Sequence, residues 1–413
     1  MENRERSGRL TAQYALLHGN YWMIQCSVLG YASVFLLSRG FTAGRIGLLV
    51  GCGNVIAAVL QQWAALVADK TKRYTLKDLM VCIAGICVIP AAILLFLPGG
   101  GIEIAGLFIL IIALVNAFQP LLNAVNGYYI KRGYSVNFGL ARGIGSLSYA
   151  VFSFVWGHVV NALGENVIPL AIVVLLCVLT GQLFLLPMRR GESGGEASRT
   201  DFPENSQRKT AAAAKDSTNF MKKYPLFFVL LAGIMMVFVF LNISNTYLIQ
   251  IISRFGGGSG DMGTSFAIAA VCELPMMFLF SKVVRVIKSN QLLRIGGVGF
   301  FLKAAATLAA GSVGQIHLSQ VLQAVSFAII IPASVYYADE LMDEGDRVRG
   351  QALITAATTV GGLVGSVAGG RLIDVAGVQA MLSAGVFCAG AGMALIFAAA
   401  VPAGRRRRGE QER

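Results

Sequence analysis

Apolar stretches of about 18 or more residues recur from near the start of the chain to near its end. Each is long enough to cross a hydrocarbon core of about 30 Å as a helix. Only 13% of the 413 residues are charged, whereas a soluble domain carries about 25%. Backbone groups in lipid must be satisfied internally, and these runs are too long and too uniformly apolar for barrel strands. The chain is therefore expected to be an all-α membrane protein.

The hydropathy pattern predicts twelve transmembrane helices. Their expected ranges are 12–38, 43–68, 76–98, 102–130, 138–162, 166–188, 224–252, 261–287, 291–312, 315–340, 347–373 and 377–402. The first apolar run follows a polar start and is long enough to span, so no cleavable signal peptide is expected.

The basic residues are distributed unequally between the two sides of this topology. Of the 34 Lys and Arg, 28 fall on the side that holds both termini and four on the opposite side. This asymmetry predicts an integral membrane protein with both termini in the cytoplasm. The net charge of +13 is explained by this bias, so no nucleic-acid partner is expected; the lipid bilayer is the expected one.

A polar, basic stretch at 189–223 divides the predicted helices six and six and is expected to be a cytoplasmic linker. The expected domains are an N-terminal six-helix bundle (1–188), this linker, and a C-terminal six-helix bundle with a basic tail (224–413). Short matches between the halves, such as Tyr128-Tyr129 with Tyr336-Tyr337, indicate two pseudo-symmetric bundles. Such repeats place a solute site at their interface.

Neither a cofactor nor a metal is expected. All seven cysteines fall inside apolar segments and none are paired at metal-ligand spacing. No phosphate-binding loop or ATPase motif is present, so transport would use an ion gradient or no energy source. The sequence also lacks the His-Glu-x-x-His and Ser/His patterns of a membrane-embedded enzyme, and it has no recognisable signalling domain of a sensor.

Glu273 is the only acidic residue placed deep within a predicted span. It lies roughly 18 Å into its helix at about 1.5 Å per residue, and Lys303 has a similar depth on the next helix. An ionisable group at this depth is costly and usually faces a cavity or a partner. The pair is interpreted either as a functional site or as an ion pair that joins the two helices.

Polar residues on other predicted helices are candidates for a cavity lining. Arg142 lies about five residues into its helix and could bind solute or simply mark the cytoplasmic edge. Asn116, Gln119, Asn123 and Asn126 share one face of the fourth helix, where they would either line a wet cavity or join helices. Further candidates are Gln25, Tyr31, Asn242 and Asn245.

Several segments together resemble the major facilitator superfamily, and within it the oligosaccharide/proton symporters of the lactose permease-like branch. The loop from Ala68 to Arg73 resembles the loop between helices 2 and 3 of that family, which implies a gating loop containing Asp69, Lys70 and Arg73. The segment Phe138–Gly145 resembles its helix 5, and Cys272-Glu273-Leu274 resembles its helix 8. The resemblance implies that Arg142 and Glu273 bind sugar, that Lys303 takes part in proton coupling, and that the chain lies in a bacterial cytoplasmic membrane.

Some positions depart from the symporter pattern. Two helix 7 aspartates of that branch are replaced by Asn242 and Asn245, and Gln323 begins a segment without its Lys-x-x-His-x-x-Glu pattern. The family's own proton carboxylate is therefore missing, which leaves Glu273, tuned by Lys303, as the one acid available at the midplane.

The resulting expectation is a secondary active transporter that moves a small polar solute, foremost a sugar or oligosaccharide, by alternating access with H+ as the coupling ion. A nucleoside or aromatic-acid transporter and an uncoupled facilitator of the same fold are the alternatives.

Overall fold

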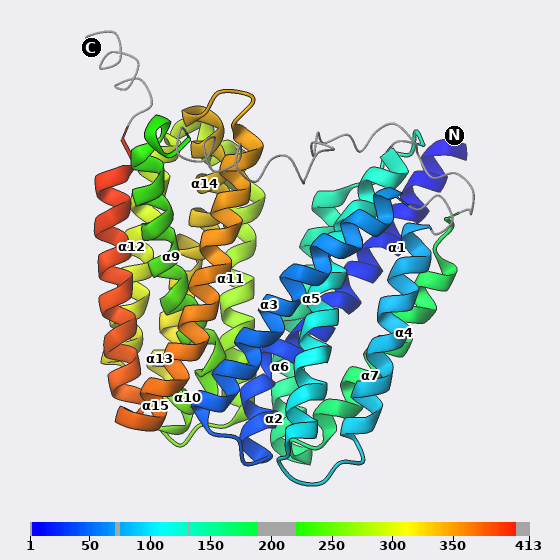
Figure 1. Cartoon of the computed structure of the whole chain (residues 1–413), viewed down its shortest axis with the longest axis horizontal. Coiled ribbons are helices and arrows are strands. Elements are labelled where there is room, and N and C mark those ends of the chain that lie inside the picture. Colours follow the sequence, from blue (N-terminus) through cyan, green and yellow to red (C-terminus); the bar gives the residue numbers. More distant parts are fainter. Residues whose placement is uncertain (1, 71–74, 131, 189–219, 402–413) are drawn as a thin grey trace, which may run out of the picture.

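The computed structural model describes residues 2–70, 75–130, 132–188 and 220–401, with only the backbone given for 2–6 and 63–70. Within these ranges every regular element is a helix. Figure 1 shows two helical bundles side by side, the N-terminal one in blue to green and the C-terminal one in green to red.

The N-terminal bundle begins with a broken helix. Its parts are α1 (Glu2–Gln25), a π-helical turn (Cys26–Gly30) and α2 (Ala32–Ser38), with a bend of 43° between the long and the short part. The bundle continues with α3 (Ala43–Lys70), α4 (Leu76–Leu94), α5 (Ile102–Ile130), α6 (Phe138–Leu163) and α7 (Val167–Leu185). Polar caps define two starts: Thr75 forms a capping box with Asp78, and the Asn137 side chain accepts from the Leu140 amide.

The C-terminal bundle repeats this arrangement. It consists of α9 (Pro225–Thr246), α10 (Leu248–Ser253), α11 (Ser259–Val286), α12 (Ser289–Ala309), α13 (Val313–Val321), a 3-10 turn (Leu322–Val325), α14 (Phe327–Leu341) and α15 (Arg347–Ala399). The 53 residues of α15 are interrupted at Gly377, whose φ of 81° is left-handed. Glycine tolerates this conformation because it lacks a Cβ, and the chain reverses direction there (Figure 1).

The number of spans agrees with the sequence prediction. Among the described residues, ten helices are long and apolar enough to cross a membrane, and the bent pair α1–α2 makes eleven. The break at Gly377 divides α15 into two, which gives twelve. The predicted ranges 224–252 and 315–340 each contain a helix break that hydropathy alone did not reveal, after Thr246 and after Val321.

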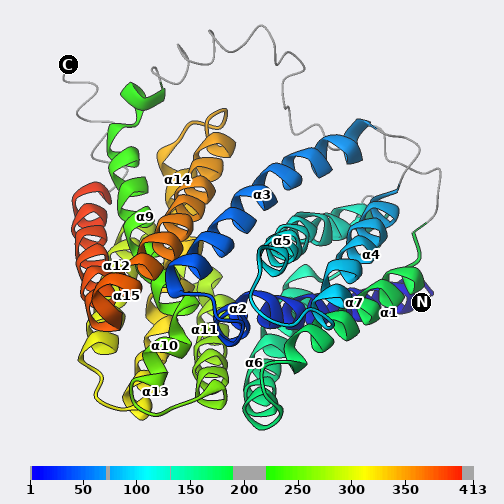
Figure 2. The same ribbon diagram turned by 60° about the horizontal axis from the view of Figure 1, so that its bottom comes forward.

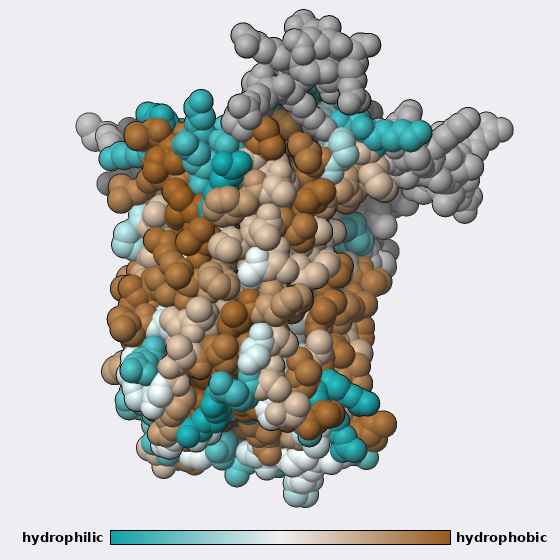
Figure 3. Space-filling model, turned by 90° about the vertical axis from the view of Figure 1, so that its left-hand side faces the viewer, coloured by the Kyte–Doolittle hydropathy of each residue, from teal (hydrophilic) through white to brown (hydrophobic). Residues whose placement is uncertain are grey.

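The outer surface fits a bilayer. Figure 3 shows a face of the molecule that is largely hydrophobic over its middle, with hydrophilic residues concentrated near the two ends. Exposed apolar side chains such as Val59, Phe184 and Phe387 are unfavourable in water but suit lipid contact. The integral membrane prediction is supported on this ground.

The bundles meet through two pairs of helices, α6 with α11 and α3 with α15. Glycines allow these helices to approach closely, as at Gly157 and Gly263, whose Cα atoms lie next to each other. Figure 2 shows that α2 lies where the bundles come together, at the end of the molecule away from the start of α1.

Candidate functional site

A cavity of about 320 Å³ lies between the two bundles. This volume is in the range of small-molecule sites, about 300–1,000 Å³. Its lining combines carboxamides, hydroxyls, aromatic rings, one arginine and one glutamate. The polar and aromatic members are Trp22, Gln25, Asn54, Arg142, Ser146, Tyr149, Asn242, Asn245, Thr246, Phe266, Glu273, Gln323 and Phe327. Arg142 and Glu273 are the charged residues of this lining, and they carry opposite formal charges.

The N-terminal bundle contributes the cation. Arg142 on α6 places its guanidinium carbon 4.2 Å from the centre of the Trp22 ring on α1, in a cation–π contact, and its Nη1 donates to Ser146 Oγ at 2.9 Å. Ser146 lies one turn further along α6, so the two side chains share a face. These contacts orient the guanidinium and leave it several further N–H donors.

The C-terminal bundle contributes the acid through a three-residue chain. Lys303 on α12 is fully buried and donates to Gln323 Oε1 at 2.5 Å, while Gln323 Nε2 donates to Glu273 Oε1 at 2.9 Å. The carboxamide thus connects the ammonium to the carboxylate and lines the cavity beside Glu273. The predicted proximity of Glu273 and Lys303 is present, but Gln323 mediates it, and Lys303 itself lies behind the cavity wall.

A carboxamide network closes one side of the cavity. Gln25 donates to Asn116 Oδ1 at 2.9 Å, Asn116 donates to Asn54 Oδ1 at 2.7 Å, and Gln61 donates to the Asn116 backbone carbonyl at 2.9 Å. Gln25 also donates to the hydroxyl of Tyr21. These bonds join α1, α3 and α5, so Asn116 has the helix-joining role that was one of the two interpretations of the α5 stripe.

The predicted solute ligands divide into two groups. Gln25, Arg142, Asn242, Asn245 and Glu273 line the cavity. The other four, all described, are not among its lining residues: Tyr31, Gln119, Asn123 and Asn126.

Two members of the second group show where these side chains lie, and the role of all four as solute ligands stays a prediction. The hydroxyl of Tyr31 points into the contact between α6 and α11, where it donates to the Ser153 carbonyl at 3.2 Å. On α5, Asn116 is bonded to Gln25 and Asn54, which line the cavity, and Asn123, two turns further along the same helix face, is exposed.

The predicted gating loop is only partly visible. Asp69 and Lys70 are the last residues of α3, where only the backbone is described, and Arg73 lies outside the described residues. Residues 189–219 of the predicted linker and 402–413 of the predicted tail also lie outside the described residues.

Sequence reasoning missed Gln323, Asn54, Ser146 and Tyr149 as lining residues. For Gln323 the sequence offered a signal, since it occupies the start of the segment where the symporter pattern has a lysine. Asn54 lies seven residues, or two turns, before Gln61 on α3, which places both on one helix face. The single carboxamide of Asn54 on an apolar helix did not indicate a cavity, because its hydrogen-bond partners on other helices are not apparent from the sequence.

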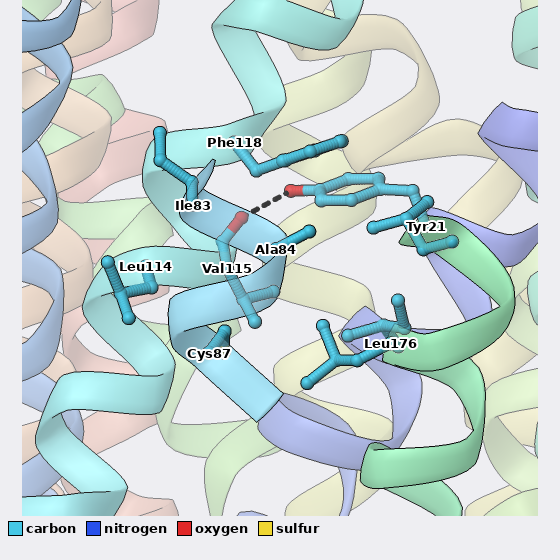
Figure 4. Close-up of a pocket in the computed structure, with 10 residues that line it drawn as sticks. Tyr21, Ile83, Ala84, Cys87, Leu114, Val115, Phe118 and Leu176 are labelled. Atoms are coloured by element: carbon cyan, nitrogen blue, oxygen red, sulfur yellow. Dashed lines mark hydrogen bonds between the residues drawn. The ribbon is translucent and has the colours of Figure 1, made fainter. Parts of the chain in front are cut away.

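A second, much smaller void of about 10 Å³ lies inside the N-terminal bundle. Figure 4 shows its apolar lining, with the Tyr21 hydroxyl directed to the Val115 carbonyl at 3.3 Å. The void has room for about one water molecule at most. It is a packing feature of the bundle and offers no solute site.

The twelve spans, the two related bundles and the polar cavity between them define a polytopic membrane transporter. The sequence matches the model of the MFS_1 like family over residues 17–384. The chain belongs to this family of the major facilitator type. Among curated proteins, no sequence matches it.

Solved structures of major facilitator transporters have the same fold. A variant of the nucleoside transporter NupG superposes with a TM-score of 0.78 at 15% identity, covering 94% of this chain and 98% of that one. A variant of the peptide transporter POT gives 0.68 at 11% identity, covering 98% and 95%. A bacterial homologue of the lysosomal transporter Spinster, solved inward-facing and unoccupied, gives 0.63 at 14% identity, covering 95% and 97%. These similarities show the fold, and the family match identifies the chain as a transporter and not an enzyme.

Proposed function

We propose that the protein carries a small, uncharged solute with a sugar ring through the central cavity by alternating access, together with a proton. The observation that carries this proposal is that Arg142 and Glu273, from opposite bundles, line one cavity. A solute held between them contacts both halves of the protein, so its binding is sensitive to their relative position.

The lining favours hydroxyl-rich solutes. A carboxylate accepts directed hydroxyl hydrogen bonds, and a guanidinium donates several in a fixed plane. The Trp22 ring, covered on one face by Arg142, and the Tyr149 ring offer apolar surfaces for the face of a sugar. A sugar or oligosaccharide is therefore the first candidate.

A nucleoside is the second candidate, and a specific observation favours it. Asn242 and Asn245 on α9 line the cavity together with the rings of Phe266 and Phe327. Carboxamides pair with the edge of a nucleobase and aromatic rings stack on its face. NupG, which shares this fold, is a nucleoside transporter.

Proton coupling is proposed for Glu273. It is the acid that lines the cavity, and its carboxylate is connected to the buried Lys303 ammonium through Gln323. A carboxylate that exchanges its partners as the bundles move can change its protonation with the state of the transporter. We also propose that both termini are cytoplasmic and that the division into domains follows the linker at 189–223.

The test has two stages. A thermal-shift screen of sugars, nucleosides and aromatic acids on the purified protein identifies the class, and stabilisation by aromatic acids alone would contradict the proposal. Proteoliposomes with an imposed pH gradient and no sodium then test coupling. Accumulation above equilibrium that is lost in Glu273→Gln, while exchange persists, supports it; downhill equilibration alone refutes it.

A further inference from the structure

The first span of each bundle is broken at a tyrosine. Tyr31 separates the π-helical turn from α2, with φ −103° and ψ 12°, and Tyr247 separates α9 from α10, with φ −109° and ψ 21°. The two residues therefore have nearly the same non-helical backbone conformation. Both side chains are fully buried, so their hydroxyls require hydrogen-bond partners inside the protein.

Each hydroxyl lies at a crossing between the bundles. Tyr31 reaches the Ser153 carbonyl of its own bundle at 3.2 Å and the Ser259 carbonyl of the opposite bundle at 3.5 Å. Tyr247 reaches the Ser366 carbonyl of its own bundle, and the Ala43 carbonyl of the opposite bundle at 3.3 Å. Each tyrosine thus contacts the helix pair through which the bundles meet, α6–α11 in one case and α3–α15 in the other.

Glycines give both hydroxyls access to these crossings. A Cβ at Gly157 would lie 2.8 Å from the Tyr31 hydroxyl, and one at Gly263 would lie 2.7 Å from it. At the second crossing, a Cβ at Gly47 or Gly370 would likewise lie too close to the Tyr247 hydroxyl. It would also meet the carbonyl of Ser366 or Ala43, respectively. A methyl group at any of these four positions would compete with the tyrosine for space.

The spacing of the residue numbers shows that the two crossings occupy equivalent positions in the two bundles. Tyr247 follows Tyr31 by 216 positions, and Ser259 follows Ala43 by the same number (247 − 31 and 259 − 43). Ser366 follows Ser153 by 213 positions, as Gly370 follows Gly157 (366 − 153 and 370 − 157). The tyrosine, its two acceptors and its two glycines therefore recur as a set, although the halves share little sequence elsewhere.

We propose that Tyr31 and Tyr247 are paired latches that hold the bundles together at the end of the molecule opposite the start of α1 and the end of α15. Both crossings lie toward this end, where α2 and α10 are found (Figure 1). The proposal rests on the alternation between two states in the proposed function, but not on the solute or the proton.

The two acceptors explain how a latch can open at low cost. When the bundles separate, the cross-bundle carbonyl is lost while the carbonyl of the tyrosine's own bundle stays in reach. The hydroxyl is then never left without a partner in an apolar interior, which would cost far more than the bond itself. Hydrogen bonds between membrane helices contribute about 0.6 kcal/mol on average, which corresponds to about a threefold change in an equilibrium.

The experiment is hydrogen–deuterium exchange on the full chain in lipid nanodiscs, without added solute. Tyr31→Phe and Tyr247→Phe are compared with the parent protein at the latched ends of both helix pairs, residues 153–163 with 259–266 and 43–50 with 366–376. Tyr14→Phe is the matched control, because that buried hydroxyl donates to the Leu122 carbonyl at 3.1 Å within one bundle.

Each latch variant is expected to increase exchange by about threefold at both helix pairs, because a rigid-body opening separates both crossings at once. The double variant should increase it by about tenfold, and Tyr14→Phe should leave it unchanged. Faster exchange confined to the variant's own helix pair would overturn the proposal in favour of local packing, as would no change or an equal effect of Tyr14→Phe. Because no solute is present, either outcome is independent of the proposed substrate.

Discussion

Replacing Gln323 by leucine is the most informative perturbation of the candidate site. Gln323 is 5% exposed and is the side chain that donates to Glu273 while accepting from Lys303. Leucine has a similar volume but no polar atoms, so the ammonium of Lys303 loses this acceptor. In the part of the chain that the structure describes, no other side-chain acceptor for Lys303 is found.

The expected cost follows from the two bonds. A hydrogen bond to a charged group contributes about 1.5–3 kcal/mol, and leaving a buried charge without its partner costs about 3–5 kcal/mol. Lys303 is fully buried and Glu273 faces the cavity, where solvent can replace the lost donor. The cost of leaving the Lys303 ammonium without its acceptor is therefore the larger one, and Gln323→Leu should lower the free energy of unfolding by about 3 kcal/mol.

A second variant separates lost charge compensation from lost packing. Lys303→Met in the Gln323→Leu background removes the buried charge and keeps a similar shape, so it should recover about 2 kcal/mol. Reversible unfolding in mixed detergent micelles measures both. If Lys303→Met/Gln323→Leu is no more stable than Gln323→Leu, the lysine does not depend on the carboxamide and the reasoning fails.

Three further sets of variants test the cavity and the crossings. Asn242→Cys and Asn245→Cys should react with a water-soluble thiol reagent, and the identified solute should slow that reaction, whereas Val59→Cys on a lipid face should not react. If Asn242→Cys and Asn245→Cys are as unreactive as Val59→Cys, α9 does not line the cavity. Glu273→Gln and Arg142→Lys should each weaken solute binding about tenfold, because an amide is a poorer acceptor than a carboxylate and lysine lacks the planar donor set. Titration calorimetry measures both, and unchanged affinity in both would reduce the pair to a structural role. Gly47→Ala should open the latched end, because its methyl group would meet the Ser366 carbonyl, while Gly85→Ala, which has free space, should not; deuterium exchange of residues 366–376 distinguishes them.

The sequence by itself determined the number and order of the membrane-spanning helices. The length of the apolar segments predicts the helices, because a bilayer requires every backbone hydrogen bond to be made within the protein and allows few other structures. The same constraint made Glu273 and Lys303 recognisable, since a charge in the middle of an apolar segment is costly and must have a partner. Periodicity, however, identifies a helix face without saying what that face meets. It placed Asn116 and Asn123 on one face, but only the structure shows that the first joins three helices and that the second is exposed.

Only the tertiary structure decided which side chains meet across the chain. Gln323 lies 50 residues from Glu273 and 20 from Lys303, and nothing local to it reveals that its amide connects the two. Tyr31 was one of the candidate solute ligands, and only the structure shows that it lies at a helix break with its hydroxyl near a carbonyl 228 residues away. Such contacts depend on where helices bend and cross. Those geometries are set by small residues, caps and packing from distant segments, which no single stretch of sequence contains.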